Sequence, residues 1–279
     1  MAYKSLFTVL TNSAFVAPVL EQATALAAAH DAHLDVLCMG VDRTQTGYYY
    51  AGASAMVLQE TISRAQEDAQ EIEDAAKAFL SKTEIRWGTE QSVAQMADLS
   101  RIVAAHARFS DLVVLPQPYG EDHSAEMEPV IEAALFDGKV PVLMLPDGKP
   151  PMTQAKTISI AWNESNESLM AVRAALPYLQ AAESVHVVVI DPSTHGPTRS
   201  DPGGLLSQYL ARQGVRAEID VLAKTMPRVS DVLLRHAADT KTDLVVMGAY
   251  GHSRFREAIL GGATRYMLEQ TELPVLMAH

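Results

Sequence analysis

The residues best suited to chemistry lie in the glycine-rich segment LVVMGAYGHSRFREAILGGAT, residues 244–264. A short apolar run ends at Gly248, and Gly251, Gly261 and Gly262 follow before a helical pattern begins. A strand that leads through glycines into a helix start presents main-chain N–H groups to an anion. The spacing G-x2-G-x9-G-G therefore predicts an anion site, although neither GxxxxGK[ST] nor GxGxxG occurs in the chain.

Polar side chains within this segment add hydrogen-bond donors and positive charge: His252, Ser253, Arg254 and Arg256. A guanidinium group can hold a phosphate through two parallel hydrogen bonds. We expect Arg254, rather than Arg256, to bind the phosphate because Arg254 lies closer to Gly251 in the sequence. Two alternatives remain open: the side chains are solvated, with Glu257 neutralising one of them, or the glycines serve a tight turn and helix packing.

Composition restricts the class of protein. The chain has 279 residues, of which 48 % are hydrophobic and 20 % charged, as in soluble proteins of two ordinary domains. The net charge of −12 argues against a nucleic-acid partner and against docking on anionic membranes. The single cysteine, Cys38, lies in an apolar run and is expected to be a small buried residue. Without a signal peptide or a membrane-spanning run, a cytoplasmic location is expected.

The chain contains one structural unit twice. Three pairs of segments correspond in order along the two halves: Lys4–Val9 with Lys156–Ala161, Ser110–Leu115 with Thr242–Met247, and Val140–Leu145 with Leu273–Ala278. The turn-rich stretch Pro146–Pro151 separates the two copies, because neither a helix nor a strand continues through it. We therefore predict domains at residues 1–149 and 153–279.

Strand and helix patterns alternate within each copy, and the strands are continuous runs of Val, Ile and Leu. Such strands are covered on both faces, which predicts an α/β fold with a doubly wound parallel sheet. The predicted strands are residues 6–10, 34–39, 85–87, 113–115 and 142–145, then 157–161, 184–190, 217–222, 244–247 and 275–278. The predicted helices are residues 15–30, 57–82 and 93–107, then 167–179, 205–213, 229–238 and 263–270.

Ligands of such sheets bind beyond the carboxyl ends of the strands, where the winding reverses. Three segments of the second copy follow strand ends, namely Trp162-Asn163, Asp191 and the segment from Gly248. We expect them to converge on one crevice.

The first copy has lost this anion chemistry. Its corresponding segment, PQPYGEDHSAEMEP, retains only Gly120, and Glu128 and Pro129 stand in place of Gly261 and Gly262. Proline offers no amide donor, and each carboxylate here repels a phosphate by about 1 kcal/mol at 4 Å in water. We therefore expect a solvated acidic loop on a scaffold or partner surface. Asp122, His123 and Glu126 match no metal motif, and His186 and His236 are expected to be structural, so no metal site is predicted.

The duplicated α/β unit, the glycine spacing and the Pro-Val-Leu-Met strand at Pro274–Met277 resemble the universal stress protein family in its tandem form. The resemblance implies two five-stranded domains of strand order 3-2-1-4-5, related by pseudo-twofold symmetry. It further implies adenine held near the ends of the first two strands, phosphates held by the glycine motif, and a role in stress response.

Individual positions carry the resemblance. Gly248, Gly251 and Gly261 match the three glycines of the family, whereas Gly262 stands where its ATP-binding members usually have Ser or Thr. Loss of that hydroxyl is worth roughly 1.5–3 kcal/mol, or about tenfold or more in affinity. Asn163 replaces the usual Asp near the ribose. The implied binding residues are Ala161, Trp162, Asn163, Val189, Met247, Gly248, Gly251, His252, Ser253, Arg254, Gly261, Gly262, Ala263 and Thr264.

The leading hypothesis is a stress-response regulatory protein that binds ATP, or ADP or AMP, with or without Mg²⁺. The bound nucleotide would favour a conformation that binds an unidentified protein partner. One alternative is a dimerising interaction module that needs no ligand. Another is a slow ATPase, for which only His252 and Glu257 lie nearby, so we name no catalytic residue. The fifth strands, 142–145 and 275–278, would expose sheet edges, and we expect them to pair within a pseudo-dimeric monomer or homodimer.

Overall fold

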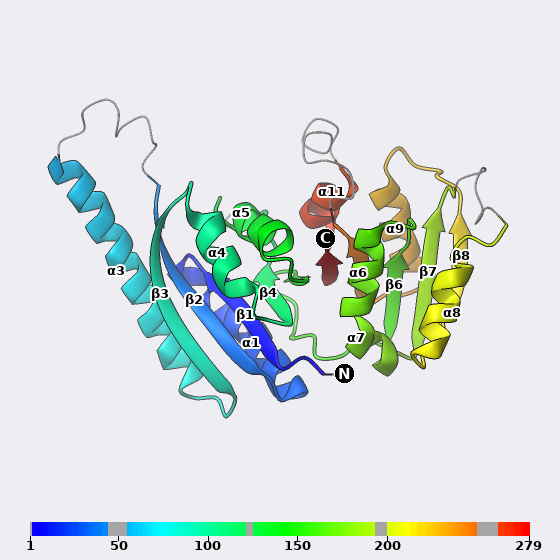
Figure 1. Ribbon diagram of the computed structural model, residues 1–279, viewed down its shortest axis with the longest axis horizontal. Helices are drawn as coiled ribbons and strands as arrows, with labels where there is room; N and C mark the ends of the chain where they lie inside the picture. Colours follow the sequence, from blue (N-terminus) through cyan, green and yellow to red (C-terminus); the bar gives the residue numbers. More distant parts are fainter. Residues whose placement is uncertain (1, 44–54, 121–124, 193–199, 250–261) are drawn as a thin grey trace. The chain divides into compact units, whose positions relative to one another are not determined.

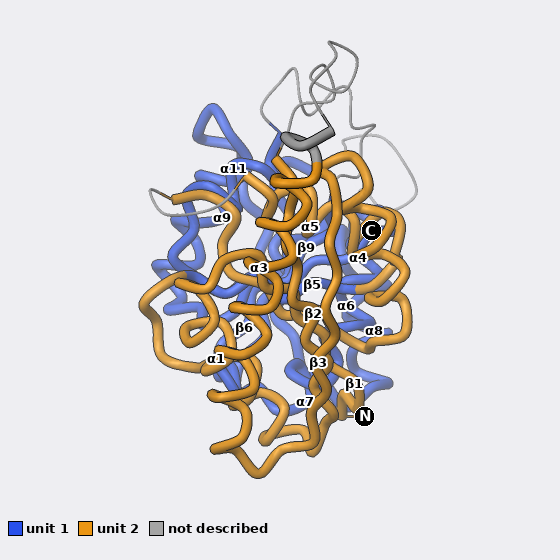
Figure 2. The backbone as a smooth tube through the Cα atoms, turned by 90° about the vertical axis from the view of Figure 1, so that its left-hand side faces the viewer, with its two compact units in different colours: residues 1, 141–146, 152–279 blue, residues 2–140, 147–151 orange. Residues whose placement is uncertain are grey.

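The computed structural model describes residues 2–43, 55–120, 125–192, 200–249 and 262–279, with only the backbone described at 55–58. Figure 2 colours the two compact units into which the chain divides. We call residues 2–140 and 147–151 the N-terminal unit, and residues 141–146 and 152–279 the C-terminal unit. The predicted boundaries at 149 and 153 assign residues 142–145 to the first copy, whereas by contacts these residues group with the C-terminal unit.

The N-terminal unit contains four parallel strands in the order β3-β2-β1-β4. These are β1 (Ser5–Leu10), β2 (His33–Asp42), β3 (Arg86–Gln95) and β4 (Leu112–Pro116). Helices α1 and α3 cover one face of the sheet and α4 and α5 the other (Figure 1). The helical segments are η1 (Ser13–Phe15), α1 (Val16–His30), α3 (Ala55–Leu80), α4 (Leu99–Ala107), α5 (Met127–Glu132) and η2 (Ala133–Asp137).

The C-terminal unit contains the parallel order β8-β7-β6-β9-β10, which is 3-2-1-4-5 within its own half. Its strands are β6 (Thr157–Ala161), β7 (Ser184–Ile190), β8 (Glu218–Leu222), β9 (Leu244–Gly248) and β10 (Val275–Ala278). Its helices are α6 (Asn166–Ala174), α7 (Leu176–Ala181), α8 (Gly204–Arg212), α9 (Val229–Asp239) and α11 (Ala263–Gln270). In strand order β5 (Val142–Leu145) follows β4, so the N-terminal half also has the order 3-2-1-4-5. The predicted doubly wound α/β fold is confirmed.

The two fifth strands pair with each other, as the exposed-edge argument predicted. Strand β5 runs antiparallel to β10, with Leu143 opposite Leu276 and the neighbouring residues in register. Both leucines are completely buried. Each strand therefore covers an edge that would otherwise present unpaired N–H and C=O groups.

An equivalent aspartate ties the first strand to the fourth in both halves. The Asp111 carboxylate accepts from the main-chain N–H groups of Lys4 and Ser5 at 2.7 and 3.0 Å. The Asp243 carboxylate accepts from the corresponding groups that precede and begin β6, both at 2.9 Å. The repeat in the sequence is thus a repeat of hydrogen bonds as well as of apolar strands.

Two element boundaries differ from the prediction for identifiable reasons. Strand β3 continues to Gln95, which pairs with Asp42, so the predicted helix at 93–107 begins only at Leu99. The predicted helix at 167–179 is split into α6 and α7, with Pro177 in the first turn of α7. Proline cannot continue a helix because it lacks the N–H group and clashes with the preceding turn.

Cys38 is fully buried in β2, as expected for a small apolar residue. Burial, and secondly the negative charge of Glu73, raises the pKa of its thiol from 9.0 to about 12. The thiol is therefore protonated at neutral pH and is a poor nucleophile. Among the described helices, none has the length and apolar character needed to cross a membrane.

Candidate functional site

The carboxyl ends of three neighbouring strands meet at one edge of the C-terminal sheet (Figure 1). Ala161, the last residue of β6, is in register with Val188 of β7 and with Met247 of β9. The Trp162 N–H donates to the Val188 carbonyl at 2.9 Å, which continues the pairing past the end of β6. The structure therefore places Ala161, Trp162, Val189 and Met247 at the same edge of the sheet.

The turn between β6 and α6 is built around Asn163. Its side-chain oxygen accepts from the Ser165 N–H at 3.2 Å, and Glu164 between them has a left-handed φ of 63°. Ser165 in turn caps α6 by accepting from the Ser168 N–H at 3.1 Å. The oxygen of Asn163 thus already holds the turn, and a ribose hydroxyl would use its remaining lone pair or the side-chain NH₂ group.

The end of β7 presents main chain rather than side chains. Val189 is only 5 % exposed. Its side chain lies 3.6 Å from where a Cβ would stand on Gly203, whose φ of 93° favours glycine at the start of α8. After the strand, the Asp191 N–H donates to the Leu222 carbonyl at 2.8 Å, with Asp191 itself at a left-handed φ of 51°.

Gly248 has a packing role of its own at the end of β9. A Cβ there would lie 2.6 Å from the main-chain nitrogen of Ser168 and 2.8 Å from the carbonyl carbon of Glu167. Strand β9 therefore approaches the first turn of α6 more closely than any side chain allows. Beyond it, the Ala249 N–H donates to the Ala278 carbonyl at 2.8 Å, which fixes the point where the chain leaves the sheet. The packing alternative for the glycines thus holds at Gly248, with or without a ligand.

Helix α11 begins directly after the glycine segment. Gly262 is its N-cap, with φ −56° and ψ 154°, and offers no capping side chain. Ala263 and Thr264 form its first turn, and Thr264 is 3 % exposed. The first N–H groups of any helix have no partner within it and carry partial positive charge. Five predicted binding residues lie outside the described residues: Gly251, His252, Ser253, Arg254 and Gly261.

A further cation near this helix was not predicted from the sequence. The Arg228 guanidinium stacks over the Tyr266 ring at 3.9 Å from its centroid. Tyr266 is the fourth residue of α11. Arg228 directly precedes α9, where nothing in the local sequence suggests a site. It adds positive charge close to the start of α11.

In the N-terminal unit, the segment that corresponds to the start of α11 carries a buried carboxylate, Glu126. Glu126, the N-cap of α5, is 1 % exposed, and its Oε1 lies 2.6 Å from Arg43 Nε. Arg43 follows the last residue of β2. The expectation of a solvated acidic loop is therefore wrong for Glu126, because Arg43 compensates its buried charge. Glu126 is thus a buried carboxylate of the chain itself at the start of α5.

Comparisons with known proteins identify a family domain in the C-terminal half. Residues 154–279 match the model of the universal stress protein family. The curated universal stress protein Slr1230 of Synechocystis is 29 % identical over 92 residues, which is 33 % of this chain and 31 % of that relative. The matched part therefore spans less than a third of the relative's length.

Solved structures resemble the chain over nearly all its length. A universal stress protein from Archaeoglobus fulgidus DSM 4304 superposes with a TM-score of 0.68 at 17 % identity, covering 98 % of this chain and 95 % of that one. A functionally unknown protein from Pseudomonas aeruginosa PAO1 gives 0.59 at 16 % identity, with 99 % and 92 % covered. At such identities the likeness concerns the fold. Residues 154–279 therefore form a universal stress protein family domain, and the N-terminal half of the chain has the same fold.

Proposed function

We propose that the C-terminal unit binds ATP, or the related nucleotides ADP or AMP, and that nucleotide occupancy regulates the protein in a stress response. The universal stress protein family domain at residues 154–279 supports the stress-response role. The nucleotide proposal rests on the neighbouring strand ends of β6, β7 and β9, and on the glycine-rich sequence between β9 and α11. This is the place where a parallel α/β sheet binds its ligands.

The start of α11 is suited to a phosphate group. Gly262 provides no side chain to cap the first turn, and the first N–H groups of a helix point out of its N-terminal end. The helix dipole adds partial positive charge at the same point. Arg228 lies close by, and Arg254 and His252 belong to the segment just before the helix.

This local charge has to act against the field of the whole chain. With a net charge of −12, the protein repels a nucleotide at long range. Mg²⁺ would lower the charge of the incoming nucleotide and is therefore part of the proposal. The N-terminal unit, where Glu126 already pairs with Arg43, is expected to bind no nucleotide. We expect one nucleotide per chain.

Substitution of Gly262 by serine tests the proposal through a gain of affinity. The backbone at Gly262, with φ −56° and ψ 154°, is open to any residue. A hydroxyl donating to a charged phosphate oxygen contributes about 1.5–3 kcal/mol, so G262S should bind ATP about tenfold or more tightly than the natural protein. Calorimetric titration of the full chain with Mg-ATP measures both affinity and stoichiometry.

The matched control is Gly262→Ala, which adds the Cβ without the hydroxyl and should not gain affinity. If neither the natural protein nor G262S gives any heat with ATP at about 1 mM, the proposal is wrong. The chain would then be better explained as an interaction module that needs no ligand. If phosphate is released from ATP no faster with the protein than in buffer alone, an ATPase activity is separately excluded.

A further inference from the structure

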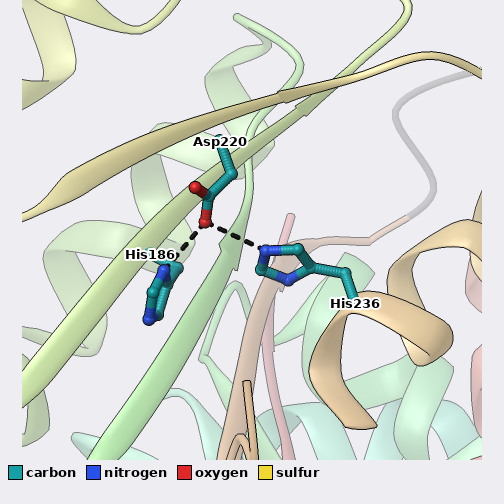
Figure 3. A group of neighbouring side chains, drawn as sticks. All are labelled: His186, Asp220 and His236. Atoms are coloured by element: carbon teal, nitrogen blue, oxygen red, sulfur yellow. Dashed lines mark hydrogen bonds and ion pairs between the residues drawn. The ribbon is translucent and has the colours of Figure 1, made fainter. Parts of the chain in front are cut away.

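Two histidine side chains that the nucleotide proposal does not use converge on one carboxylate oxygen of Asp220 (Figure 3). Asp220 Oδ2 lies 2.8 Å from His186 Nδ1 and 2.9 Å from His236 Nε2. One ligand atom from each of the three residues lies within 4.8 Å of the others. Two imidazoles and a carboxylate are thus already gathered at the spacing of a metal site.

The fold explains why residues so distant in sequence meet. Val188 of β7 is in register with Asp220 of β8, and His186 lies two residues earlier on the same face of β7. Helix α9 packs against β7 and carries His236 toward both residues. No spacing in the sequence could reveal this set, because each ligand comes from a different element.

The surroundings support one of the histidines as a ligand. Ser184 Oγ lies 3.1 Å from His186 Nε2, the ring nitrogen that does not face Asp220. A metal on Nδ1 requires the proton on Nε2, and Ser184 can accept that hydrogen bond. Partners of this kind fix the tautomer and the ring orientation of metal-binding histidines.

Charge and access also favour a cation. Glu218, the register partner of His186, adds a second carboxylate to the same face of the sheet. The guanidinium of Arg235, the neighbour of His236 in sequence, donates to the Thr225 hydroxyl. The side chains of His186, Asp220 and His236 are 14 %, 29 % and 11 % exposed, so the cluster is partly open to solvent and an ion can reach it.

We propose that His186, Asp220 and His236 bind one divalent transition-metal ion and that this ion is Zn²⁺. Zinc takes nitrogen and carboxylate ligands at about 2.0–2.2 Å and leaves a fourth position to water when the protein supplies three. Ligand atoms around such an ion are about 3.3 Å apart, so the present 2.8–2.9 Å spacing must open by roughly half an ångström. Other ions would follow the usual order of divalent affinities.

This site is separate from the strand ends of β6, β7 and β9. His186 precedes the end of β7 at Ile190 by about 13 Å at the usual rise of a strand. The cluster lies on the sheet face beneath α9, at the edge strand β8. The proposal therefore does not rest on nucleotide binding.

The test uses the full chain, without a histidine tag or nucleotide, after removal of metals by chelation. Co²⁺ is the spectroscopic probe, since its visible bands report a low-coordinate nitrogen and oxygen site, and Zn²⁺ then displaces it. We expect one equivalent of Co²⁺ per chain, displaced by one equivalent of Zn²⁺. His236→Gln and Asp220→Asn should each weaken binding by about 100-fold or more, beyond what loss of an outer-shell partner costs.

The matched control is His33→Gln, which removes the exposed His33–Asp35 pair, 3.1 Å apart, in the N-terminal unit. It should bind metal like the natural protein. Zn²⁺ should also raise the melting temperature of the natural protein and of H33Q but not that of D220N, whose fold is checked by circular dichroism in chelator. Absence of the Co²⁺ bands, or equal binding by the natural protein and D220N, would show that the cluster is only a hydrogen-bond network and would overturn the proposal.

Discussion

Replacement of Gly40 by alanine is expected to destabilise the N-terminal unit by about 3 kcal/mol, the upper part of the range for overpacked cores. An ideal Cβ on Gly40 would stand 1.7 Å from the main-chain oxygen of Ala65 and 2.6 Å from its carbonyl carbon. These atoms belong to the middle of α3, which packs along β2. A helix backbone cannot yield at one residue without loosening its packing along the whole strand.

Urea unfolding followed by circular dichroism measures this loss, and Gly88→Ala is the matched control. Gly88 lies in the adjacent strand β3, where an added Cβ meets nothing closer than 3.4 Å. G88A should differ from the natural protein by less than about 1 kcal/mol, in either direction. Equal unfolding midpoints for G40A and G88A would mean that α3 does not lie as close to β2 as described.

The second large effect concerns nucleotide affinity. Gly251→Glu should weaken ATP binding by about 100-fold or more, because it places a carboxylate in the segment proposed to face the phosphates. One such charge costs about 1 kcal/mol at 4 Å in water and about 4 kcal/mol near a protein surface of lower dielectric, and 2.7 kcal/mol corresponds to about 100-fold. Gly251 lies outside the described residues, so the prediction rests on its spacing from Gly248 and Gly262.

Gln117→Glu controls for the change in net charge alone. Gln117 directly follows β4, in the copy that is expected to bind no nucleotide. Its substitution adds the same single negative charge with almost no change in volume, so ATP affinity should stay within about twofold of the natural value. Calorimetry on both variants, with melting temperatures to confirm folding, distinguishes a local effect from a global one. Equal losses in the two variants would contradict a phosphate site in the segment after β9.

Apolar patterns predicted much of the fold because strands buried on both faces are continuous runs of apolar residues in the sequence. Strand β10 and helix α11 have the predicted bounds, 275–278 and 263–270. The pairing of β5 with β10 was predicted from two similar strands that each needed a partner. The strand ends at Ala161, Val189 and Met247 follow from the same patterns, since parallel strands end at one edge.

The features that escaped prediction depend on contacts between distant segments. Polar residues at the end of β3 gave a helical pattern, yet their pairing with β2 decides their conformation. Gly40 and Gly248 are glycines because a helix approaches a strand, which cannot be seen without both partners. The burial of Glu126 likewise depends on Arg43, which is far away in the sequence.

Photolabelling of the full chain with 8-azido-ATP, followed by peptide mapping, tests the central claim most directly. That claim is that the C-terminal copy of the fold binds an adenine nucleotide and the N-terminal copy does not. We predict one label per chain, prevented by excess ATP, in the peptides that carry Trp162 and Val189. An ATP-protected label in the N-terminal unit near Arg43, or no protected label anywhere, would contradict the account.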